Sequence, residues 1–124
     1  SLRGDRDRVQ AVHELSLAGG VLRLVEEAAA REGFARVSVI RLIVGKLSGI
    51  EVESLRFALE AIASGTCLAG ATIEIDEPPG EAWCLVCGRP TPLAQRGEAC
   101  VHCNGYQLQV TAGTEMRVVD LLVD

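Results

Sequence analysis

The amino-acid sequence predicts an α+β domain with a metal-held insertion before its last strand. Three observations support this fold class. Helix-like and strand-like apolar patterns alternate along the first part of the chain. Two Cys-x-x-Cys pairs then follow in a segment without periodicity. The last apolar segment, Met116–Val123, has no core of its own beside so short a metal loop, so we expect it to return to the first sheet.

Composition limits the classes of function. The chain has 124 residues, with 48% apolar and 23% charged residues, which is typical of a folded globular protein. Twelve basic and 17 acidic residues give a net charge of −5, and only 3% of residues are aromatic. These values disfavour binding to nucleic acid, which needs basic surfaces and stacking side chains. We see no apolar run that could span a bilayer and no signal peptide, and we therefore expect a cytoplasmic protein.

The first 79 residues contain two expected helices and two expected strands. Residues 1–11 are polar and aperiodic, and we expect a flexible tail there. Apolar residues at spacings of three and four predict a helix over Leu15–Glu32, and β-branched residues predict a buried strand over Arg36–Val44. A second amphipathic helix is expected over Val52–Ser64, and strict alternation predicts a strand over Ala71–Glu77.

A Pro-Pro-Gly sequence at positions 78–80 stops any regular element and marks a domain junction. We therefore predict an α/β domain over 12–79 plus 110–124 and a metal-held domain over 80–109. Within residues 81–106 no periodic element is expected.

Four of the five cysteines have the spacing of a zinc ribbon. Cys84 and Cys87 form one pair, Cys100 and Cys103 form the second, and 12 residues separate them. A two-residue gap lets one tight turn direct two thiolates at one ion, and two such turns complete a tetrahedron. A rubredoxin-like iron site and two disulfides are the alternatives. The missing signal peptide argues against disulfides, and the absence of the usual loop proline argues against iron.

Metal binding would also supply the free energy that this segment lacks. About 25 residues with four thiols and one Trp cannot bury enough surface to fold unaided. A structural zinc site contributes on the order of 10–16 kcal/mol in peptides. Four thiolates leave no open coordination position, so the predicted zinc has a structural role and no hydrolytic one.

Two further residues need an interpretation. His102 lies inside the second Cys pair, and we interpret it as a solvent-facing residue of the turn. Cys67 has no partner motif, and we interpret it as a small, buried apolar residue.

His13 and Glu14 stand at the start of the first predicted helix. Taken alone, an adjacent imidazole and carboxylate could cap the helix, contact solvent or hold a metal. The rest of the chain changes this interpretation.

Seven motifs follow one another from His13 to Val119. They are His-Glu-Leu-Ser-Leu (13–17), Val-Gly-Lys-Leu-Ser-Gly-Ile-Glu (44–51), Ser-Leu-Arg-Phe (54–57), Ala-Gly-Ala (69–71), Ile-Glu-Ile (73–75), the two Cys-x-x-Cys pairs and Glu-Met-Arg-Val-Val (115–119). In this order they are the ones by which the chain resembles the HypA/HybF family, the nickel-insertion accessory proteins of nickel–iron hydrogenase maturation. The resemblance implies two helices on a three-stranded mixed sheet, with an inserted zinc-ribbon domain.

The resemblance also implies a nickel site. Its side-chain ligand would be the imidazole of His13, joined by the backbone amides of His13 and Glu14 and by the amine of the preceding residue. Such a nitrogen-rich, nearly planar site suits Ni(II). Glu14 matches the acidic residue of the family motif. Glu51 lies where the family often has an acidic residue near the metal, and it is alternatively an acidic residue favoured by the dipole of the second helix.

The resemblance therefore implies a nickel metallochaperone with structural Zn(II) and transient Ni(II). It implies a nickel-handling maturation GTPase and the hydrogenase large-subunit precursor as partners, and it leaves a homodimer open. No catalytic residue is assigned, because the sequence has no phosphate-binding loop of the Walker type. The main alternative is a zinc-ribbon adaptor that binds only proteins.

The position of the motif generates one more expectation. The family normally begins with a methionine directly before the His, whereas Val12 and 11 further residues precede His13 here. We expect the functional chain to begin at position 12, with a free amine beside His13.

Overall fold

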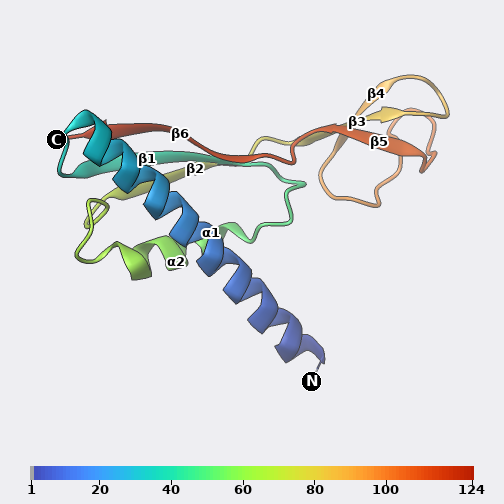
Figure 1. Cartoon of the computed structure of the whole chain (residues 1–124). Helices are drawn as coiled ribbons and strands as arrows, with labels where there is room; N and C mark the ends of the chain where they lie inside the picture. The colour runs from blue at the N-terminus through green and yellow to red at the C-terminus, as the bar shows by residue number, and fades with distance from the viewer. Residues whose placement is uncertain (1) are drawn as a thin grey trace. The chain divides into compact units, whose positions relative to one another are not determined.

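The computed structural model describes the backbone of residues 2–124 and the side chains of residues 13–124. Two helices and six strands follow one another along the chain (Figure 1). Their bounds are α1 Leu2–Glu32, β1 Val37–Val44, α2 Val52–Ala63, β2 Thr72–Asp76, β3 Gly80–Cys84, β4 Pro90–Leu93, β5 Leu108–Ala112 and β6 Met116–Val123.

Helix α1 begins earlier than the sequence predicts. The backbone is helical from Leu2, where we expected a flexible tail over residues 1–11; Ser1 lies outside the described residues. The apolar spacing that predicts a helix starts only at Leu15, so periodicity gave no signal for the earlier turns. Once a packed helix exists, each added residue gains a hydrogen bond without a new nucleation cost, and the polar segment contains no proline to stop it.

The strands form two sheets of three strands each, with the orders β2-β1-β6 and β4-β3-β5. The first sheet is mixed. Between β1 and β6, Gly45 N–H donates to Glu115 and Asp124 N–H donates to Arg36, so these strands are antiparallel. Along β1 and the segments that flank β2, Val37 N–H donates to Cys67 and Lys46 N–H donates to Pro78. Both sequences ascend together, so β1 and β2 are parallel. The predicted α+β fold with a mixed three-stranded sheet is confirmed.

The second sheet was not expected. Its strands have only five, four and five residues, and the buried positions of β3 are Gly80, Ala82 and Cys84. The period of two is therefore present in burial but not in side-chain size, so the hydrophobic pattern could not reveal it.

Contacts divide the chain into two compact units. Unit 1 comprises the chain up to Arg41 together with Ile50–Glu74 and Val118–Asp124, and unit 2 comprises Leu42–Gly49 and Ile75–Arg117. Unit 2 thus extends beyond the 80–109 segment that the sequence predicts, and it takes in the loop that follows β1.

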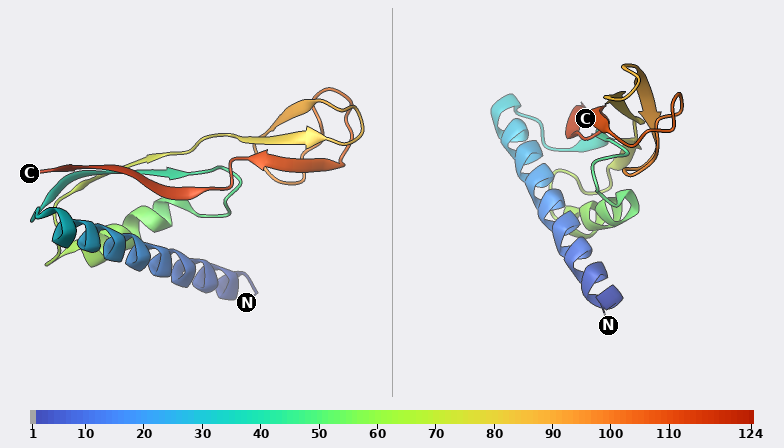
Figure 2. Two further views of the ribbon diagram at one scale, coloured as in Figure 1. Left: turned by 45° about the horizontal axis from the view of Figure 1, so that its top comes forward. Right: turned by 90° about the vertical axis from the view of Figure 1, so that its right-hand side faces the viewer.

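In unit 1 the two helices pack against each other and lie on the same side of the sheet (Figure 2). Their buried side chains and those of β1 form the core. They are Ala18, Val21, Val25 and Ala28 from α1, Val37 and Ile40 from β1, and Leu55, Ala58, Leu59 and Ala63 from α2. The buried positions of α1 are three or four residues apart, as the prediction requires, but Leu15 and Leu24 of the predicted apolar face are about half exposed.

An ion-pair ladder crosses all three strands of this sheet. Arg41 Nε donates to Glu74 Oε2 at 2.9 Å, and Arg41 Nη1 lies 3.5 Å from Asp120 Oδ2. The hydrogen bond to Glu74 and the charge of Asp120 raise the pKa of Arg41. These side chains are about half exposed, so the ladder favours the strand register more than it adds to stability.

Unit 2 has a small core of its own. Leu47, Ala82 and Leu93 are buried together, and Leu108 and Val110 pack against them. Leu47 comes from the loop after β1, far from the ribbon in sequence. Two hydrogen bonds hold this loop in place: Leu47 N–H donates to the Gly113 carbonyl at 2.8 Å, and the Arg96 guanidinium donates to the Leu47 carbonyl at 3.3 Å.

Two glycines allow the chain segments of unit 2 to come this close. A Cβ at Gly45 would overlap the carbonyl group of Gly113. Gly113 itself has φ +93°, and a Cβ there would lie 2.6 Å from the Cα of Gly80. Both clashes involve backbone atoms, which cannot move aside as a flexible side chain can.

Neither helix combines the length and the apolar character needed to cross a membrane, as judged over the described part of the chain.

Removing the side chain of Leu47 tests whether this loop belongs to the ribbon core. We expect Leu47→Ala to destabilise unit 2 by about 2–4 kcal/mol, because it leaves a cavity in a core of five side chains. The measurement is urea unfolding of the zinc-loaded chain, followed by the fluorescence of Trp83. Leu85→Ala is the matched control: Leu85 is 61% exposed, and its loss should change stability by less than about 0.5 kcal/mol. Equal effects of both variants would contradict this assignment.

Candidate metal centre and the N-terminal site

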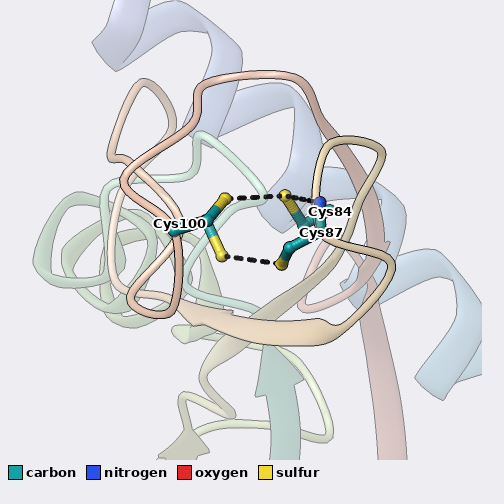
Figure 3. A group of neighbouring side chains, drawn as sticks. Cys84, Cys87 and Cys100 are labelled. Carbon is teal, nitrogen blue, oxygen red and sulfur yellow. Dashed lines mark hydrogen bonds between the residues drawn. The ribbon is translucent and has the colours of Figure 1, made fainter.

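The two cysteine pairs meet in unit 2. The sulfurs of Cys84, Cys87, Cys100 and Cys103 all lie within 4.8 Å of one another, and the labelled side chains point toward one another (Figure 3). Cys84 Sγ is 3.6 Å from Cys103 Sγ, and Cys87 Sγ is 3.8 Å from Cys100 Sγ. Sulfurs bound tetrahedrally to zinc at about 2.3 Å are about 3.8 Å apart, so the four thiols fit this ion.

The same backbone turn holds each pair. In the first turn, Cys84 N–H donates to Arg89 and Gly88 N–H donates back to Cys84, at 2.9 Å each. In the second, Cys100 N–H donates to Gly105 and Asn104 N–H donates back to Cys100. The fourth residue after the first cysteine is left-handed in both turns, with φ +69° at Gly88 and +65° at Asn104. Glycine and asparagine are the residues that adopt this conformation most readily.

Backbone amides favour thiolates at the first cysteine of each pair. Cys87 N–H points at Cys84 Sγ at 3.5 Å and lowers the pKa of the Cys84 thiol. Burial raises the pKa of Cys100, but N–H donors from His102 and Cys103 outweigh it and lower this pKa to about 6. Burial raises the pKa of Cys87 to about 12. A bound cation would favour the thiolate at every position, because a metal-bound thiol loses its proton.

A buried threonine braces the second turn, and sequence reasoning missed it. Thr91 is 1% exposed, and its Oγ1 accepts a hydrogen bond from Val101 N–H at 3.2 Å. His102 is exposed, with Nε2 3.1 Å from the Pro90 carbonyl. No spacing rule pairs a strand threonine with a turn ten residues later, so only the folded chain reveals this contact.

Cys67 lies outside the thiol cluster. It is partly buried, and burial raises the pKa of its thiol. It belongs to unit 1, whereas the cluster belongs to unit 2.

The three residues of the expected nickel site have different environments. His13 is exposed on α1, whereas the adjacent Glu14 is fully buried. Glu14 Oε2 accepts a hydrogen bond from the backbone N–H of Glu51 at 3.3 Å, across 37 positions of sequence. The structure thus brings the start of α2 to the helix turn that carries His13.

Glu51 is the N-cap of α2. Its backbone is extended, with φ −82° and ψ 108°, and its side chain accepts a hydrogen bond from Glu53 N–H at 3.4 Å. The structural alternative for Glu51 is therefore present in the fold, where it satisfies an N–H group that the helix leaves free. Among the described side chains, only the four cysteines bring three or more metal-ligating groups together. His13, Glu14 and Glu51 form no such cluster.

Comparison with known proteins identifies the family of this chain. The protein-family model described as "Hydrogenase/urease nickel incorporation, metallochaperone, hypA" matches residues 12–123. The chain belongs to the HypA family.

Relatives and solved structures extend this result. The chain is 66% identical over 113 residues to hydrogenase maturation factor HypA of Cupriavidus necator, covering 91% of this chain and 95% of the relative. It is 61% identical over 112 residues to the protein of that name from Polaromonas naphthalenivorans, covering 90% and 97%. The solution structure of the nickel metallochaperone HypA from Helicobacter pylori has the same fold, with a TM-score of 0.61, 22% identity, and 89% and 96% of the two chains covered.

The geometry also explains two HypA motifs of this chain physically. Within Val44–Glu51, Gly45 permits the backbone crossing, Leu47 fills the ribbon core and Glu51 caps α2. In the His-Glu pair, Glu14 anchors α1 to that cap. Both motifs therefore have a structural role, whether or not they also bind nickel.

Serine substitutions test the zinc centre. We expect Cys84→Ser, Cys87→Ser, Cys100→Ser or Cys103→Ser each to release zinc and unfold unit 2, because an incomplete tetrahedron cannot order so small a core. The measurement is zinc per chain by elemental analysis, with Trp83 fluorescence as the probe of folding. Cys67→Ser is the matched control and should retain one zinc per chain. Release of zinc by Cys67→Ser would show that the ligand set is different.

Proposed function

We propose that this HypA-family chain binds Ni(II) at His13 and helps insert it into the large-subunit precursor of a nickel–iron hydrogenase. A nickel-handling maturation GTPase would power or time the transfer. The family match over residues 12–123 is the observation that carries this proposal. The exposed imidazole of His13, beside a carboxylate that is fixed to the next helix, supports it.

In this proposal Glu14 is a positioning residue. Its side chain is fully buried and accepts a hydrogen bond from the backbone N–H of Glu51. This bond keeps the N-terminus of α2 beside His13. Glu51 is exposed, and its second carboxylate oxygen could ligate the ion or orient the imidazole. Exposed nitrogen ligands with few anionic side chains suit a cargo ion, because delivery needs release as well as binding.

The resident metal of the protein has a separate role. Zinc held by the four thiolates would fix the two turns of unit 2 and close its coordination shell. The residues Gly88, Thr91 and Asn104 shape the turns that present those thiolates.

The two histidines of the chain provide a matched test of the nickel site. His13→Ala should weaken Ni(II) binding by more than about 100-fold, because losing even an outer-shell partner costs 10–100-fold. Nickel is titrated against a competing chelator, with zinc content measured in the same sample. His102→Ala, in the exposed turn of the ribbon, should keep its nickel affinity. Unchanged binding in His13→Ala would show that His13 does not bind the ion and would contradict the proposed site, whereas no nickel binding by the unmodified chain would favour a zinc-ribbon adaptor.

The length of α1 generates a second prediction. Inside a helix, the N–H groups of His13 and Glu14 are bonded to carbonyls four residues earlier, so backbone ligation requires this turn to open. The first four N–H groups of a helix have no such partner. A chain that begins with Met at position 12 should therefore bind Ni(II) more tightly than the 124-residue chain, with a visible spectrum of planar nickel. Equal affinities and spectra for the two forms would show that neither the amine nor these amides bind the ion.

A further inference from the structure

The outward face of the β4-β3-β5 sheet carries the chain's single tryptophan. In β3, Gly80, Ala82 and Cys84 are buried, whereas Glu81 and Trp83 are exposed. Residues directly opposite one another in antiparallel strands share a face. The register pairs Trp83 with Pro90 and with Gln109, and it pairs Glu81 with Pro92 and, beyond a register shift, with Ala112. The outward face is therefore a row of Pro, Trp and Gln beside a row of Pro, Glu and Ala.

Three properties distinguish this face from an ordinary solvated surface. Trp83 is 43% exposed although it lies in the centre of the sheet. A hollow of about 310 Å³ beside Glu81 is lined by Pro79, Gly80, Glu81, Pro90, Thr91 and Pro92. Among the outward strand positions Glu81, Trp83, Pro90, Pro92 and Gln109, the carboxylate of Glu81 is the one charge.

The chemistry of this face selects its ligand. Pro90 and Pro92 lack an N–H group, so β4 cannot accept a full additional strand along its edge, and recognition must use side chains. An exposed indole attracts a cation above its ring, and a carboxylate two positions along the same strand lies about 7 Å away. A planar guanidinium can stack on the indole and also donate to the carboxylate.

We propose that this face is a docking surface for a segment of a partner protein that presents an arginine among apolar side chains. The guanidinium stacks on Trp83 and pairs with Glu81, and the apolar neighbours pack on Pro90 and Pro92. Charge complementarity supports a cationic partner, because the one charged side chain among these outward strand positions is the carboxylate of Glu81. A second copy of this chain fits less well, since a symmetric contact would bring Glu81 against its own equivalent. The proposal is independent of the nickel site.

Two matched peptides test the proposal on the zinc-loaded full chain. They are the capped pentapeptides Ala-Leu-Arg-Leu-Ala and Ala-Leu-Glu-Leu-Ala, titrated by NMR with the indole N–H of the single tryptophan as reporter. The arginine peptide should give saturable shifts centred on Trp83 and the β3 amides, and these should weaken as salt is added. The glutamate peptide should give none. No saturable shift with the arginine peptide, or equal shifts with both, overturns the proposal.

Variants separate this site from unspecific attraction to an acidic protein. Glu81→Gln should weaken binding about three- to fivefold, as expected for one partly exposed ion pair, and Trp83→Leu should weaken it similarly when followed on the Gln109 amide. Tyr106→Ser, which removes a 74% exposed aromatic side chain of the same unit, should leave the affinity unchanged. Unchanged affinity in Glu81→Gln and Trp83→Leu overturns the proposal. A dimer without peptide that Trp83→Leu dissociates would assign the face to a second copy instead.

Discussion

Unit 2 depends on the convergence of four cysteine sulfurs at one point. The core beneath its three-stranded sheet has five apolar side chains, and one of them, Leu47, is contributed by the loop after β1. A core of this size cannot offset the conformational entropy of more than 40 residues, about 1–2 kcal/mol for each residue backbone. The two cysteine turns, by holding a metal ion, would supply the stabilising free energy that this core lacks. Their matched backbone bonds place the sulfurs at the separations that a tetrahedral ion requires, so we expect metal binding and folding to be coupled.

The loop from Gly45 to Glu51 connects this constraint to the helices. Leu47 is held in the ribbon core by backbone bonds to Gly113 and by Arg96, and four residues later Glu51 caps α2. Glu14 then ties that cap to α1, next to His13. The segment 45–51, which looks like a simple turn in the sequence, therefore has two structural roles. Its Leu47 packs in the ribbon core, and its Glu51 caps α2. Its residue types have structural reasons that are separate from metal binding.

The thiol cluster and the proposed nickel site differ in the way that their proposed functions require. The thiol cluster is partly enclosed: Cys84 and Cys100 are buried with amides aimed at their sulfurs, Cys87 is half-buried and Cys103 is exposed. Such a closed set of four soft ligands suits an ion that stays. His13 lies on the exposed side of a helix, and the carboxylate beside it is already engaged with the backbone of Glu51. An exposed imidazole without a preformed cluster suits an ion that is passed on.

The sequence alone determined the features that depend on local spacing. The two Cys-x-x-Cys pairs predicted the thiol cluster because a two-residue gap directs both thiols to one side of a turn. Apolar spacing predicted both helices, and strict alternation predicted β2. β-Branched residues predicted β1, and a mostly apolar segment predicted β6. Tertiary structure decided what depends on contacts between distant residues. The insertion of Leu47 into the ribbon, the brace from Thr91 to Val101 and the bond between Glu14 and Glu51 join positions that no local pattern relates. The ribbon strands also stayed hidden, because the buried positions of β3 are small residues and β4 has only four residues, two of them proline.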